Sequence, residues 1–176
     1  MNLPNKLTII RIALVPVCLI FLALGWHIAA GAMFAVASIT DYVDGYLARK
    51  HNLVTNFGKF ADPIADKILT ATMMILMAAK GLLPVWLPII VVIRELMVDG
   101  LRLIAVEKGT VVAAGMSGKV KTALQMITII YACVFQNVLG LLLAIVSAAL
   151  TVYSGAEYFY KLRHLFLKDL SKNDGE

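Results

Sequence analysis

The chain has 176 residues, of which 61% are hydrophobic and only 15% are charged, and its formal net charge is +5. A typical soluble domain is about 45–50% apolar and about 25% charged, so this composition excludes an ordinary soluble protein and favours the membrane class. The length suits a single domain, and we expect one membrane domain over residues 1–176. Both cysteines lie inside apolar runs, which argues against a disulfide framework or a zinc finger.

Six mostly apolar segments follow one another, each close to the about 20 residues that a helix needs to cross a bilayer. The first could be mistaken for a signal peptide, but Arg11 and Pro16 interrupt it and no small-residue cleavage site follows. The sequence therefore predicts an all-α, polytopic membrane protein with six transmembrane helices. The segments run roughly from Leu7 to Leu24, Ile28 to Leu47, Pro63 to Ala79, Pro84 to Val106, Val120 to Phe135 and Leu139 to Tyr160.

Basic residues are concentrated at one set of segment ends. The opposite set holds only Lys80, and Arg94 lies inside a segment. Because Lys and Arg favour the cytoplasmic side, we expect a multi-pass protein of the cell membrane with both termini in the cytoplasm. Contact with anionic membrane lipid then explains the positive charge, and no nucleic-acid partner is expected. The basic ends hold Lys6, Arg11, Arg49, Lys50, Lys59, Lys67, Arg102, Lys108, Lys119, Lys121, Lys161, Arg163, Lys168 and Lys172.

Four aspartates stand at the cytoplasmic ends of the second and third segments. Asp41 and Asp44 are three residues apart and Asp62 and Asp66 are four apart, so each pair shares one helix face. The short connection makes the two helices antiparallel neighbours, which places the two pairs at a similar depth. A carboxylate inside a membrane helix costs about 2.5–3.5 kcal/mol, so this placement indicates a function.

Four carboxylates in one pocket would repel one another unless some are protonated or a cation is bound. Oxygen ligands favour Mg²⁺, Mn²⁺ or Ca²⁺ over zinc. Two such cations about 4 Å apart could stabilise an in-line displacement at phosphorus. Two other interpretations stay open on these residues alone. The acids could be loop residues paired with Arg49, Lys59 and Lys67, or they could line the cation path of a small transporter.

Small residues follow the first acid pair. Gly45 and Ala48 lie about one turn later, on or near the same face, where a flat ligand could lie against the helix backbone. Together with the aspartates they complete a pattern that resembles the signature of the CDP-alcohol phosphotransferases, a family of six-helix membrane enzymes. Each signature position is filled at its expected spacing. The positions are Asp41, Asp44, Gly45, Ala48, Arg49, Gly58, Asp62 and Asp66.

The resemblance implies a role for each of these residues. Asp41, Asp44 and Asp62 would hold two metal ions, Mg²⁺ or Mn²⁺. Asp66 would contact a metal ion and act as the catalytic general base. The family also implies a homodimer. The headgroup of CDP-diacylglycerol would bind at Gly45, Ala48, Arg49, Thr55 and Gly58.

Three further strings resemble the phosphatidylglycerophosphate synthases of this family: residues 3–8 with Arg11, residues 93–95 and residues 118–122. This resemblance implies an enzyme of phospholipid biosynthesis that transfers a phosphatidyl group from CDP-diacylglycerol to glycerol 3-phosphate. Other acceptors stay open, as in a cardiolipin, phosphatidylserine or phosphatidylinositol-phosphate synthase. Asn5 and Thr8 could contact the CDP phosphates or could instead cap the first helix.

A phosphorylated acceptor carries about two negative charges near neutral pH and needs a cationic pocket. Each basic candidate also has a structural alternative. Arg94 could pair with Glu95 or Asp99, Arg102 could pair with Asp99, and the lysines could only mark the cytoplasmic side. The candidates for the acceptor phosphate are Arg94, Arg102, Lys119 and Lys121.

Overall fold

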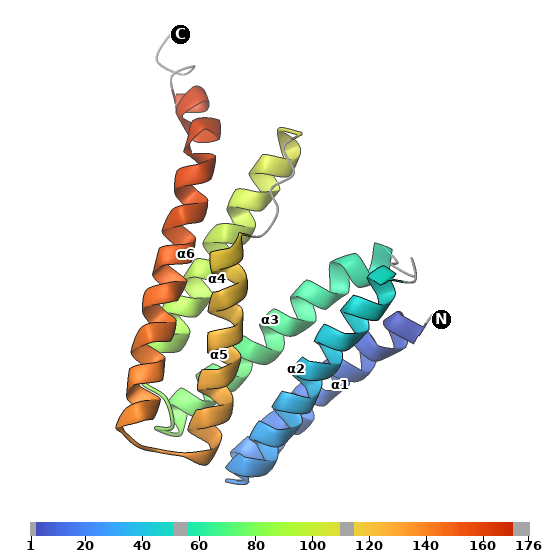
Figure 1. Ribbon diagram of the computed structural model, residues 1–176, viewed down its shortest axis with the longest axis vertical. Coiled ribbons are helices and arrows are strands. Elements are labelled where there is room, and N and C mark those ends of the chain that lie inside the picture. Colours follow the sequence, from blue (N-terminus) through green and yellow to red (C-terminus); the bar gives the residue numbers. More distant parts are fainter. Residues whose placement is uncertain (1–2, 51–55, 110–114, 171–176) are drawn as a thin grey trace.

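Six α-helices make up the fold in a computed structural model of the chain (Figure 1). The structure describes residues 3–50, 56–109 and 115–170, and it describes side chains over residues 9–40, 62–109 and 115–163. The all-α, six-helix prediction is confirmed. The helices are α1 (Leu3–Ala23), α2 (His27–Lys50), α3 (Asn56–Ala79), α4 (Trp86–Glu107), α5 (Met116–Val134) and α6 (Val138–Leu170).

Glycines end three of the helices. Gly25, Gly81 and Gly109 each stand two residues beyond a helix and have positive φ values of 84°, 74° and 72°. After α1, the Trp26 N–H donates to the Phe21 carbonyl at 2.9 Å and the Gly25 N–H donates to Leu22 at 3.2 Å. This Schellman pairing satisfies carbonyls that the helix leaves open and turns the chain back on itself.

All the helices except α4 are longer than the apolar segments that predicted them. The third helix begins at Asn56 rather than at Pro63, and the sixth continues to Leu170 rather than ending near Tyr160. Apolar composition detects only the part of a helix that suits a bilayer, so it misses the polar first and last turns. Asp62 and Asp66 therefore lie well inside α3.

Length and composition single out one membrane span within the described residues, Val138–Arg163 of α6. Two shorter apolar stretches, Ile9–Ala23 and His27–Thr40, belong to α1 and α2. Charged residues interrupt α4, where Arg94, Glu95 and Asp99 fall within a short stretch. The crossing of a membrane by all six helices therefore stays a prediction.

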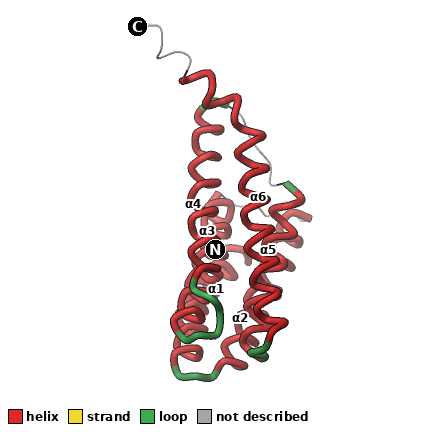
Figure 2. The backbone as a smooth tube through the Cα atoms, turned by 90° about the vertical axis from the view of Figure 1, so that its left-hand side faces the viewer, coloured by secondary structure: helices red, strands yellow, loops and turns green. Residues whose placement is uncertain are grey.

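The helices form two groups that meet along α5. Helix α1 packs on α2 and α3, whereas α4 and α5 pack on α6. Helix α5 also contacts α2 and α3, and α3 contacts α4, so the two groups share an interface. In Figure 1 the end of α6 lies at the top, and the start of α1 lies at the right beside the end of α2 and the start of α3. Figure 2 shows the bundle from the side.

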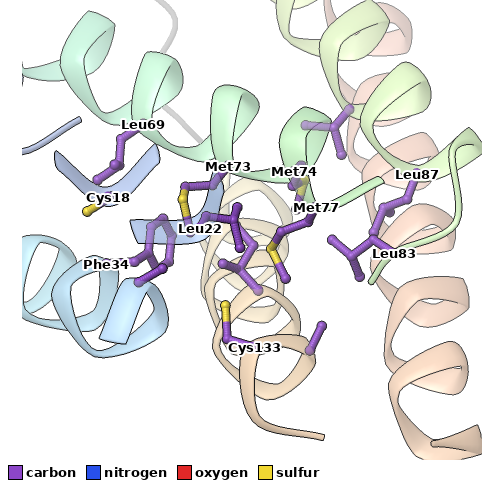
Figure 3. Packing of buried hydrophobic residues seen from close by; sticks show 14 of the residues in the cluster. Cys18, Leu22, Phe34, Leu69, Met73, Met74, Met77, Leu83, Leu87 and Cys133 are labelled. Carbon is purple, nitrogen blue, oxygen red and sulfur yellow. The ribbon is translucent and has the colours of Figure 1, made fainter. Parts of the chain in front are cut away.

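The main apolar core joins both groups away from the acidic helix ends. Phe34 of α2, Met73 and Met77 of α3 and Cys133 of α5 meet there (Figure 3). Burial of such side chains contributes about 1.5–3 kcal/mol each and fixes α3 against α5. A second, smaller cluster holds α4 on α6. Its residues are Val98, Leu101, Ala105, Tyr158 and Leu162.

Gly31 is the point of closest approach of α2 to α5. A Cβ added at Gly31 would stand 2.7 Å from the Cβ of Cys133, which cannot turn away. We expect Gly31→Ala to destabilise the protein by about 1–3 kcal/mol through overpacking. Gly100→Ala is the matched control, because no atom lies within 4 Å of its added Cβ. Thermal unfolding in detergent checks this, and a Gly31→Ala variant as stable as the wild type would contradict it.

Candidate active site

A cavity of about 1000 Å³ opens between helices α3, α4, α5 and α6. Asp66, the predicted general base, lines it from α3. The four basic residues predicted for the acceptor phosphate line the same cavity, although they are far apart in the sequence. These residues are Arg94 and Arg102 on α4 and Lys119 and Lys121 on α5.

A single carboxylate joins three cations on one wall of this cavity. The Glu95 Oε1 atom accepts from Arg94 Nη1 at 3.0 Å and also from Lys121 Nζ. The Glu95 Oε2 atom lies 3.7 Å from Lys67 Nζ. Lys121 is 5% exposed and Arg94 is 11% exposed, so water provides little of their solvation. Buried cations need a counter-charge, and Glu95 provides it.

Lys67 and Arg102 take partners that sequence spacing did not indicate. Lys67 pairs with Asp99 across the α3–α4 interface. Arg102 donates from Nε to the Tyr158 hydroxyl at 3.0 Å, and its guanidinium lies 5.2 Å from the centre of that ring. The alternative in which Arg102 pairs with Asp99 is therefore not what the structure shows, whereas the Arg94–Glu95 pair is present.

Arg94 is positioned by small residues on both flanking helices. A Cβ added at Gly155 of α6 would lie 3.1 Å from Arg94 Cγ, and one added at Gly118 of α5 would lie 3.9 Å from Arg94 Nη2. The side chain thus lies between α5 and α6. Its Nε atom is buried and has no hydrogen-bond partner among the described residues. An unpaired buried N–H is costly, which favours an anion or water at this position.

Asp62 stands one turn before Asp66 on α3, and its carboxylate Oδ1 lies 3.8 Å from Arg11 Nη1. Arg11 is nearly buried in α1, so this contact ties the first helix to the acidic end of the third. Asp41 and Asp44 belong to the last turns of α2, and their side chains lie outside the described ones.

Oxygen donors at Asp62 and Asp66 fit a hard divalent cation. Over the side chains that the structure describes, no three His, Cys, Asp or Glu residues gather as a metal site. That search does not reach the other two predicted ligands, Asp41 and Asp44. The metal site therefore stays a prediction. The two predicted ligands whose side chains the structure describes, Asp62 and Asp66, are consistent with it.

All of the predicted CDP contacts fall outside the described side chains. Thr55 lies in a segment that the structure does not describe. The others can be placed only by their helices. Asn5 and Thr8 belong to α1, Gly45, Ala48 and Arg49 to α2, and Gly58 to α3.

Sequence reasoning missed several residues that line or border the cavity. Arg11 was noted as a basic residue of the first segment and as part of a family string, but not as a partner of Asp62. Glu95 was considered as part of a family string and as a partner of Arg94, whereas it contacts three cations. Tyr158 and Glu157 lie on α6, about 60 residues along the chain from α4, and no local spacing indicated them.

Comparison with known proteins identifies the family. The family profile described as CDP-alcohol phosphatidyltransferase matches residues 1–153. The chain belongs to the CDP-alcohol phosphatidyltransferase family. This match confirms the resemblance that the aspartate pattern indicated. The matched residues include α1 to α5 and about half of α6.

Curated relatives within the CDP-alcohol phosphatidyltransferase family cover most of the chain. It is 43% identical to a CDP-diacylglycerol–glycerol-3-phosphate 3-phosphatidyltransferase from Bacillus subtilis, with 91% of this chain and 94% of the relative covered. It is 40% identical to a probable phosphatidylglycerophosphate synthase from Mycobacterium tuberculosis, covering 89% and 79%. A Rickettsia felis protein with the same name as the Bacillus relative is 36% identical, covering 94% and 97%.

Proposed function

We propose that this protein transfers a phosphatidyl group from CDP-diacylglycerol to the 1-hydroxyl of glycerol 3-phosphate. The products are phosphatidylglycerol phosphate and CMP. The relatives named for this reaction support the substrate pair, since they are similar along nearly their whole length. The observation that carries the proposal to this chain is the shared cavity, which Asp66 lines together with a set of basic residues.

The acceptor phosphate suits the basic wall of the cavity. Arg94 has a buried Nε donor left over after its contact with Glu95, and Lys121 is nearly buried beside it. Arginine can give two parallel hydrogen bonds to phosphate oxygens, and a lysine adds a point charge. A phosphate held there would leave the glycerol hydroxyls free to reach Asp66 across the same cavity.

Proton transfer to Asp66 begins the proposed reaction. The Asp66 carboxylate accepts the proton of the acceptor 1-hydroxyl, and the hydroxyl oxygen attacks the phosphorus that carries diacylglycerol. A new phosphorus–oxygen bond forms as the bond to CMP breaks, and CMP leaves with that electron pair. Basic side chains in the cavity orient the acceptor so that its hydroxyl is in line with the leaving group.

Asp41, Asp44, Asp62 and Asp66 would hold the divalent cations, Mg²⁺ or Mn²⁺. When bound, such ions supply positive charge for the pyrophosphate oxygens of the lipid substrate. Arg11 lies within 3.8 Å of Asp62 and would keep that carboxylate oriented toward the site.

The membrane arrangement forms part of the same proposal. With α1 to α6 spanning the bilayer, both termini and the aspartates would face the cytoplasm, where glycerol 3-phosphate is dissolved. Lys80 lies at the opposite end of the bundle, where its Nζ atom donates to the Ala23 carbonyl at the end of α1 at 2.9 Å. The homodimer remains an expectation from the family.

Acceptor choice is the direct test of this function. Purified protein in mixed micelles with CDP-diacylglycerol and Mg²⁺ is given glycerol 3-phosphate, phosphatidylglycerol, serine or inositol phosphate in separate reactions. We expect CMP release with glycerol 3-phosphate at least about 100-fold faster than with phosphatidylglycerol or serine, because neither of these carries the phosphate monoester that suits the cationic wall. Inositol phosphate does carry one, so that reaction tests whether the cavity also selects the glycerol part of the acceptor. Preference for another acceptor would reject the proposed substrate, and no CMP release with any acceptor would reject the reaction.

A further inference from the structure

Three helices contribute to a chain of alternating charges along the wall of the cavity. Asp99 of α4 pairs with Lys67 of α3, and Lys67 approaches Glu95 at 3.7 Å. Glu95 in turn accepts from Lys121 of α5 and from its neighbour Arg94. The contacts connect the helix that carries Asp66 with the helix that carries Lys121. Glu95 is the member of this chain with the most partners among the described residues.

Glu95 changes what its cationic partners can do. Lys121 and Arg94 are almost fully shielded from water, and without a carboxylate between them they would repel each other. Glu95 holds both through one oxygen, which fixes where their remaining N–H groups point. Lys121 Nζ has three donors and Arg94 has five, so each keeps donors for a second anion.

The balance of charge leaves room for a phosphate. Six cations line the cavity, and four carboxylates partly offset them. The net charge of these side chains is positive, as a dianionic phosphate monoester requires. It is also small enough for the helices to pack before the acceptor binds. The cations are Lys67, Arg94, Arg102, Lys119, Lys121 and Lys161, and the carboxylates are Asp66, Glu95, Asp99 and Glu157.

We propose that Glu95 is the positioning residue of the acceptor subsite, fixing Lys121 and Arg94 in the arrangement that selects a phosphate monoester. The inference rests on the proposed function. Glu95 does not touch the reacting atoms in this account, so it acts through its two cationic neighbours. It sets how tightly the acceptor binds, whereas Asp66 sets how fast the bound acceptor reacts.

The test replaces Glu95 with glutamine, which keeps the shape and removes the charge. CMP release is measured in mixed micelles at varied glycerol 3-phosphate and varied CDP-diacylglycerol. We expect the KM for glycerol 3-phosphate to rise about tenfold or more, with kcat within about threefold and the KM for CDP-diacylglycerol unchanged. Glu107→Gln is the matched control, because Glu107 is exposed at the end of the same helix and does not line the cavity.

A double variant separates positioning from a merely structural role. Lys121→Met alone should also raise the KM for glycerol 3-phosphate. If Glu95 acts through Lys121 and Arg94, adding Glu95→Gln to Lys121→Met raises that KM further by less than Glu95→Gln does alone, because only the contribution through Arg94 is left. Should Glu95→Gln prove too unstable to purify, Glu95→Asp keeps the charge but withdraws it by one methylene, and an intermediate rise in KM is expected.

Two results would overturn the inference. One is a Glu95→Gln or Glu95→Asp enzyme whose kcat falls while its KM for glycerol 3-phosphate stays within twofold of the wild type. The other is a double variant in which the two single effects multiply. A wild-type enzyme that does not use glycerol 3-phosphate would instead reject the proposed function, so the two failures are distinguishable.

Discussion

Replacement of Asp66 by asparagine should lower kcat by at least about 10³-fold, because it removes the proposed base and one oxygen ligand together. Asparagine has nearly the same shape and can remain at the cavity wall, so the fold should be retained. Steady-state CMP release from CDP-diacylglycerol, at saturating glycerol 3-phosphate, measures the loss. Thermal unfolding of the same preparation measures whether the helices are intact.

The Asp66→Asn result is compared with Glu107→Gln, which also removes one carboxylate but from an exposed position outside the cavity. The control should keep the wild-type rate. An Asp66→Asn enzyme that retains more than about a tenth of wild-type kcat would reject Asp66 as the base. Loss of rate accompanied by loss of the unfolding transition would instead show that the residue is needed for folding.

Removal of divalent metal should abolish turnover completely, and Mg²⁺ or Mn²⁺ should restore it. Carboxylate oxygens are hard ligands, so Zn²⁺ should restore much less activity at matched free concentration. The measurement is CMP release after chelation, followed by titration of each ion back into the same sample. Asp62→Asn should then need about tenfold or more Mn²⁺ for half-maximal rate, because the site keeps fewer oxygen donors.

Chelator inactivation is checked by adding the chelator already saturated with Mg²⁺, which should leave the rate unchanged. Undiminished turnover in exhaustively metal-depleted enzyme would contradict the metal assignment for all four aspartates. A normal Mn²⁺ requirement in Asp62→Asn would contradict it for Asp62 alone. The two outcomes therefore distinguish an error in the assignment of Asp62 from an error in the metal dependence of the reaction.

Local patterns in the sequence were sufficient for the six helices and for the family. Apolar segments predicted the helix order, and the signature between Asp41 and Asp66 indicated the family. The helix ends were less predictable, because stretches such as that from Asn56 to Ala61 continue a helix although Asn56, Gly58 and Lys59 interrupt the apolar run. Membrane crossing by every helix cannot be decided by composition, since charged residues of α4 face a cavity.

Partner choice among the charged residues was beyond sequence reasoning. Rules for residues three or four apart suggested that Arg102 pairs with Asp99. In the fold, Arg102 contacts Tyr158, which is 56 residues away, and Asp99 contacts Lys67, which is 32 residues away. Such contacts depend on how α3, α4 and α6 pack. The same packing places Asp66 and Lys121 in one cavity. The sequence could therefore suggest the individual basic residues for the acceptor phosphate, but not how they are arranged around it.

The most direct test of the central claim follows one oxygen atom through the reaction. Glycerol 3-phosphate labelled with ¹⁸O at its 1-hydroxyl is incubated with CDP-diacylglycerol and the purified enzyme, and both products are analysed by mass spectrometry. The proposed mechanism predicts equal amounts of CMP and phosphatidylglycerol phosphate, with all of the label in the lipid and none in CMP. Labelled CMP, or CMP formed without the lipid product, would contradict it.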